Sequence, residues 1–124
     1  MSPTTPEFEA IEARLWSILE PYRGRLEAGS VYGLVTLKWV GTKQHDFFAG
    51  VRVAPRHVAF HLMPVYTDPH LLDDVSPRLR KHLKGKTTFD FSAIDEALFL
   101  ELEGLTARSF EAYAAGHQAR PELT

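Results

Sequence analysis

Apolar residues recur at three- and four-residue spacing through the first part of the chain. Thr5, Pro6 and Glu7 are typical of a helix start, because a hydroxyl cap, a proline and an acidic residue suit the first turn. The apolar positions of this segment are Phe8, Ile11, Leu15, Ile18, Leu19 and Tyr22. The pattern predicts an amphipathic helix with one buried stripe, which ends or kinks at Pro21.

Three stretches rich in β-branched and aromatic residues follow, with short turns between them. They cover 31–40, 45–53 and 57–63 and predict strands of an antiparallel meander. In the second strand, alternation directs Phe47, Ala49, Val51 and Val53 toward the core. With a later strand included, the residues expected on the opposite, uncovered face are Tyr32, Lys38, Phe48, Arg52, His61, Met63 and Lys86.

The second half of the chain adds a short helix, a strand and a long helical region. Ser76-Pro77 predicts a helix start, and Gly85 is its expected stop. Residues 86–91 alternate as a strand with Phe89 and Phe91 inward, and residues 65–75 read as a polar loop. The last helical region begins after Ser92 or Asp95, with Gly104 as a candidate break and a frayed tail from Gly116.

This order of elements predicts a single α+β domain over residues 1–124. One antiparallel β-sheet carries the N- and C-terminal helices packed on one face, which is an α+β sandwich. The two edge strands of such a sheet need protection, and pairing with a second copy in a homodimer is one way to provide it.

The amino-acid composition excludes several kinds of functional site and partner. The 124 residues include no cysteine, which excludes disulfides, thiol nucleophiles and cysteine-ligated metals. No secretory signal and no apolar run of membrane-spanning length is visible, so we expect a cytoplasmic protein without a membrane partner. The net charge is −2, and nucleic acid is not an expected partner because no groove-reading motif accompanies the basic residues.

The stretch 58–91 holds the densest set of side chains that could bind a ligand or take part in a reaction. Lys84-Gly85-Lys86 places a flexible backbone between two cations, which suits a phosphate or carboxylate. We therefore predict a site for a small anionic ligand or a protein partner. Its candidate ligand-binding residues are His61, Met63, Tyr66, Lys84, Lys86 and Arg52. The alternative is an ordinary solvated sheet face.

Two other chemistries have weaker patterns. His61, Asp68, His70, Asp73 and Asp74 include metal-binding residue types, but their spacing matches no compact ligand motif, which favours a solvated loop. The sequence lacks a nucleophile elbow and a Gly-rich nucleotide loop. His61 as a general base is a third hypothesis, without an identified nucleophile.

Two motifs and the helix between them give a family resemblance. The hexapeptide His61-Leu62-Met63-Pro64-Val65-Tyr66, the helix led by Ser76-Pro77 and the run Gly85 to Phe91 resemble the YdhG-like family, over about residues 5–116. The resemblance implies a frataxin-like fold and a non-enzymatic iron-handling or assembly-partner protein with weakly bound iron as its cofactor. The metal positions that it implies are Glu7, Glu9, Glu12 and Asp46.

Overall fold

In the computed structural model, which describes residues 6–118, the first helix α1 spans Pro6–Leu19. Its buried residues are Ile11, Leu15, Ile18 and Leu19, so the predicted apolar stripe is confirmed. A 3₁₀ helix, Glu20–Arg25, follows directly, with Pro21 in its first turn. The predicted change at the proline is therefore correct, while the Thr5 cap lies outside the described residues.

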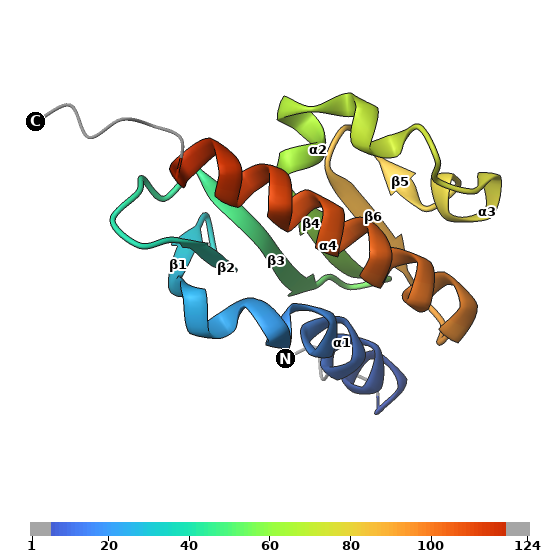
Figure 1. Cartoon of the computed structure of the whole chain (residues 1–124). Coiled ribbons are helices and arrows are strands. Elements are labelled where there is room, and N and C mark those ends of the chain that lie inside the picture. Colours follow the sequence, from blue (N-terminus) through green and yellow to red (C-terminus); the bar gives the residue numbers. More distant parts are fainter. Residues whose placement is uncertain (1–5, 119–124) are drawn as a thin grey trace, which may run out of the picture.

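Six strands within residues 6–118 form one antiparallel sheet, and the predicted α+β class is confirmed (Figure 1). Their spatial order is β1-β2-β3-β4-β6-β5. The bounds are β1 Leu26–Val31, β2 Leu34–Trp39, β3 Phe47–Val53, β4 Val58–Leu62, β5 Leu83–Lys84 and β6 Thr88–Phe91. The predicted meander corresponds to β2, β3 and β4.

Strand β1 was not predicted from the sequence. The expected single strand over 31–40 is wrong, because the chain turns at Tyr32 and Gly33 and pairs Leu26–Val31 with Leu34–Trp39. Both turn residues have positive φ, 50° for Tyr32 and 85° for Gly33, as a tight hairpin turn requires. Tyr32 therefore lies in this turn, where it is 88% exposed.

A bulge in β3 reverses the predicted facing of Phe48. Lys38 pairs with Phe47 and Leu37 with Ala49, so Phe48 is the extra residue. It is 0% exposed, and the expectation that it lies on the uncovered face is wrong. Its ring centroid lies 5.3–5.5 Å from the rings of Tyr22, Phe110 and Tyr113.

Lys38 is also absent from the uncovered surface, contrary to the prediction. It is only 4% exposed because the β2–β3 loop and β1 enclose its ammonium group. Its Nζ forms an ion pair with Glu27 Oε2 and donates to the carbonyl oxygen of Thr42 at 2.8 Å. The hydrogen bond from Lys38, aided by one from the Gly41 N–H, lowers the pKa of Glu27.

The segment between β4 and β6 contains more structure than the predicted loop and helix. Helix α2 spans Pro64–Thr67, and a 3₁₀ helix spans Pro69–Leu72. Helix α3, Pro77–Arg80, begins as predicted, with Ser76 Oγ accepting from the Leu79 N–H at 3.2 Å. It ends before the expected stop, because Leu83–Lys84 pairs with β6 as β5.

The last helix, α4, spans Glu96–Gln118 without interruption, so the candidate break at Gly104 is wrong. Asp95 Oδ1 accepts from the Leu98 N–H at 3.3 Å and caps the start, which confirms one of the two expected caps. The helix continues past Gly116, where the tail was expected to fray. Among the described residues, no helix is long and apolar enough to cross a membrane.

Helices α1 and α4 pack on the same face of the sheet, as predicted (Figure 1). Arg14 joins them, since its guanidinium contacts Glu96 at 2.9 Å and Glu103 at 2.8 Å. The core lies between these helices and strands β2, β3, β4 and β6. Its largest fully buried side chains are Phe48, Phe60, Phe89, Phe91, Phe99, Ile11, Leu15, Leu19, Leu62, Leu79, Leu102 and Leu105.

Candidate functional site

The two sequence motifs of the central stretch meet at one cavity. The cavity has a volume of about 340 Å³, near the lower end of the roughly 300–1,000 Å³ typical of small-molecule sites. Its lining residues are Val65, Tyr66, Pro69, Leu72, Leu83, Gly85 and Lys86. We call it the Tyr66–Lys86 cavity. It lies between the α2 segment and the β5–β6 turn.

Tight turns on both sides shape this cavity. Pro64 opens α2, and Asp68 closes it and then caps the next 3₁₀ helix by accepting from the His70 N–H at 3.3 Å. On the other side, Gly85 has a φ of +72°, which allows the short turn from β5 to β6. The two turns place Tyr66 and Lys86 beside each other although they are distant in sequence.

Lys86 is the cation of the cavity. Its Nζ lies 5.3 Å from the centroid of the Tyr66 ring, within the range of a cation–π contact. Tyr66 is 55% exposed, so ring and ammonium group are both accessible to solvent. Within residues 6–118, no carboxylate lies within ion-pair distance of Lys84 or Lys86. The positive charge is therefore available to a ligand.

The remaining predicted ligand residues do not line this cavity. Met63 is half-buried and precedes α2. Lys84 is exposed on β5, one residue before the turn glycine. Arg52 is exposed on β3, where it pairs with Ala59 of β4. The structure therefore joins Tyr66 and Lys86 and leaves the other four residues elsewhere.

His61 lies on β4, on the sheet face opposite the helices. Its Nδ1 and the Thr88 hydroxyl lie 3.1 Å apart, and its strand neighbour is Gly50. Burial lowers the pKa of His61, with Arg52 acting in the same direction and Asp90 opposing it. A neutral imidazole is thus favoured, as a general base requires, but the hypothesis of catalysis by His61 stays a prediction.

The acidic positions implied by the family resemblance are placed apart. Glu7, Glu9 and Glu12 lie on α1, and Glu7 and Glu9 are exposed. Asp46 lies in the β2–β3 loop, which Figure 1 shows at the other end of the molecule. Among residues 6–118, no group of three or more His, Cys, Asp or Glu side chains is arranged to hold a metal ion. Weak iron binding by these residues stays a prediction.

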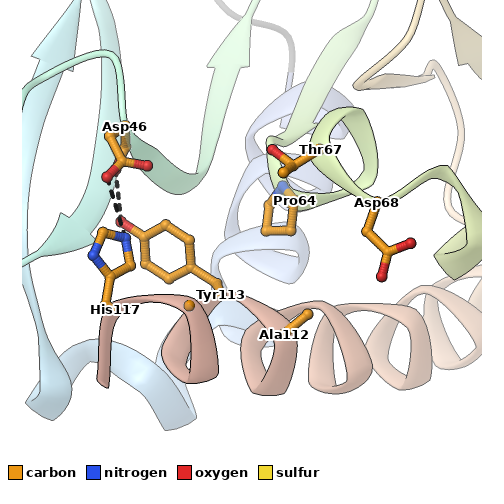
Figure 2. A pocket seen from close by; sticks show the side chains of 8 residues that line it. Asp46, Pro64, Thr67, Asp68, Ala112, Tyr113 and His117 are labelled. Atoms are coloured by element: carbon orange, nitrogen blue, oxygen red, sulfur yellow. Dashed lines mark hydrogen bonds and ion pairs between the residues drawn. The ribbon is translucent and has the colours of Figure 1, made fainter. Parts of the chain in front are cut away.

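A second cavity, of about 250 Å³, was not predicted from the sequence (Figure 2). It lies between the β2–β3 loop, the α2 segment and the last turns of α4. Its lining residues are Asp46, Pro64, Thr67, Asp68, Ala112, Tyr113, Gly116 and His117. We call it the Asp46–Asp68 cavity. Sequence reasoning treated Tyr113 as a core position and His117 as tail, and only their residue types could have drawn attention to them.

Comparisons of the chain with protein-family models, with curated proteins and with solved structures return no match. The resemblance to the YdhG-like family therefore stays a prediction that rests on the two motifs. The function must be inferred from the geometry of the cavities.

Proposed function

We propose that the protein is a binding module for a small amphipathic anion, held in the Tyr66–Lys86 cavity. The observation that carries the proposal is the ammonium group of Lys86 beside the Tyr66 ring, at the rim of a cavity with apolar walls and without a carboxylate partner among residues 6–118. Ligand sites of this kind combine apolar lining with a few convergent polar groups that fix orientation.

The chemistry of the lining indicates the ligand class. Val65, Leu72 and Leu83 offer hydrocarbon surface, so the body of the ligand should be apolar. Lys86 offers one compact positive charge, which suits a carboxylate or phosphate, and the Tyr66 hydroxyl is a further hydrogen-bonding group. An acidic side chain of a partner protein would present the same chemistry to this cavity.

An amide NMR titration with hexanoate and its neutral analogue hexanol tests the proposal. We expect hexanoate to shift the signals of Val65, Tyr66, Leu83 and Gly85, and hexanol to bind at least about tenfold more weakly, because it lacks the charge-assisted hydrogen bond to Lys86. Equal binding of both compounds would refute the proposed preference of the cavity for an anion.

The Lys86→Met variant examines the charge itself. Methionine keeps an aliphatic chain but removes the ammonium group, so hexanoate binding should weaken by about tenfold. The amide spectrum should remain that of the folded protein. Lys81→Met is the matched control, because Lys81 is also exposed and lies outside the cavity. Unchanged affinity in Lys86→Met, or an equal loss in both variants, would refute the assigned role of Lys86.

A further inference from the structure

The Asp46–Asp68 cavity carries chemistry opposite in sign to that of the proposed anion site. Figure 2 shows Asp46 and Asp68 on either side of the cavity, with Tyr113, Ala112 and His117 of α4 along its floor. Among residues 6–118, no lysine or arginine lines the cavity. Within this part of the chain, the two carboxylates therefore make the cavity favourable for positive charge.

The Asp46 carboxylate is fixed in position. Its Oδ2 accepts from the Thr42 hydroxyl at 2.6 Å and lies 3.2 Å from His117 Nε2. Its backbone oxygen accepts from the Tyr113 hydroxyl at 2.6 Å. The His117 side chain is 7% exposed and stacks on Trp39 with a centroid distance of 5.3 Å, which holds the imidazole in place.

Each carboxylate keeps one oxygen for a ligand. Within residues 6–118, Thr42 and His117 both contact Oδ2 of Asp46, which leaves Oδ1 without a donor. Asp68 Oδ1 accepts from the His70 N–H, and no donor from the described residues contacts its Oδ2. A cationic donor can therefore find a carboxylate oxygen on either wall.

Between the carboxylates, the walls are small or apolar. Pro64 and the Tyr113 ring provide hydrocarbon surface, and Ala112 and Gly116 stand one helical turn apart on α4 and leave space. A Cβ placed on Gly116 meets no atom within 4 Å. The space suits a short alkyl chain, and a carboxylate at its side suits a terminal ammonium group.

We propose that the Asp46–Asp68 cavity binds a primary alkylammonium group. The ammonium group donates to Asp68, its alkyl chain lies on Pro64 and the Tyr113 ring, and Asp46 on the other side adds to the negative potential. This chemistry is shared by free short-chain amines and by the lysine side chain of a partner protein.

An amide NMR titration with n-butylamine, and with n-butanol as the neutral control, tests this site. We expect butylamine to shift the signals of Asp46, Thr67, Asp68 and Gly116, and butanol to bind at least about tenfold more weakly. Separate titrations with 1,4-diaminobutane and with Nα-acetyl-lysine amide identify the source, since the tighter ligand indicates a free amine or a lysine side chain. No shift of these signals with any amine at millimolar concentration would overturn the proposal.

Two variants probe the geometry without removing the fold. Asp68→Asn keeps an acceptor for the His70 N–H but loses the charge, so butylamine binding should fall by about tenfold. Asp74→Asn is its control, because Asp74 is an exposed carboxylate outside the cavity. Gly116→Leu fills the free space and should abolish binding. Because leucine favours the helix more than glycine does, the fold of α4 should persist. Retained binding in Gly116→Leu, or equal loss in both Asn variants, would refute this location.

Discussion

Replacement of Phe48 by alanine distinguishes the observed bulge from the regular strand that the sequence predicts. Phe48 is 0% exposed, and three aromatic rings surround it. Truncation of a fully buried phenylalanine destabilises a protein by about 3–5 kcal/mol. A solvent-facing residue, as alternation in β3 predicts for Phe48, would instead change the free energy of unfolding by less than about 0.5 kcal/mol.

Urea unfolding followed by circular dichroism measures this difference. With an m value of about 2 kcal/mol/M, a loss of about 4 kcal/mol lowers the unfolding midpoint by about 2 M. Since domains of this size are stable by only about 5–15 kcal/mol, Phe48→Leu serves as a milder substitution if the alanine variant does not fold. Tyr32→Ala is the control, because Tyr32 was predicted on the same face and is largely exposed.

The bulge would be refuted if Phe48→Ala and Tyr32→Ala both changed the free energy of unfolding by less than about 1 kcal/mol. Such a result would return Phe48 to the uncovered face. It would also require another explanation for the aromatic contacts between β3 and α4.

Three further predictions concern pH, helix docking and iron. The pKa of His61 is lowered from its ordinary 6.5, so the unfolded chain binds the proton more tightly, and stability should fall as the pH drops below about 6.5. In His61→Gln, urea unfolding between about pH 7 and 5 should show a shallower slope, and an unchanged slope would contradict the assignment. Glu101 of α4 accepts from the N–H and the hydroxyl of Ser76, each at 2.6 Å, and so attaches the start of α3 to α4. In urea titrations, Glu101→Ala should lower the free energy of unfolding by about 2 kcal/mol. A loss near zero would contradict this role of Glu101. If the protein handles iron, millimolar Fe(II) should broaden amide signals in the first turns of α1. The absence of broadening there would refute the iron-handling hypothesis. The signals concerned are those of Glu7, Glu9 and Glu12.

Local signals predicted the parts of the fold that depend on neighbouring residues. The spacing of Ile11, Leu15 and Ile18 gave the buried stripe of α1, and Ser76-Pro77 gave the start of α3. The alternation of Phe89 and Phe91 gave the inward face of β6, because both side chains are buried. In each case the physical cause lies within one turn or one strand of the residue itself.

Features that depend on pairing between distant segments could not be predicted in this way. The β1 segment contains Glu27, Ala28, Gly29 and Ser30, which have little intrinsic strand preference, and pairing with β2 imposes its conformation. The bulge at Phe48 depends on the register between β2 and β3, which alternation along one strand does not contain.

The candidate sites divide in the same manner. The residue types of Tyr66 and Lys86 drew attention to them in the sequence, but their contact requires the β5–β6 turn beside α2. The Asp46–His117 contact joins a loop to the end of α4, and no local pattern connects these two residues. Lys38 was placed on the surface by alternation, although it is buried and its ammonium group is paired with Glu27.

The most direct test of the proposed function is an isotope-filtered NOE spectrum of the labelled protein with unlabelled hexanoate. The account predicts NOEs from the terminal methyl group of hexanoate to the methyl groups of Leu72 and Leu83, and from the methylene beside its carboxylate to the Lys86 side chain. NOEs confined to residues outside the Tyr66–Lys86 cavity, or a reversed orientation with the carboxylate against the leucines, would contradict it.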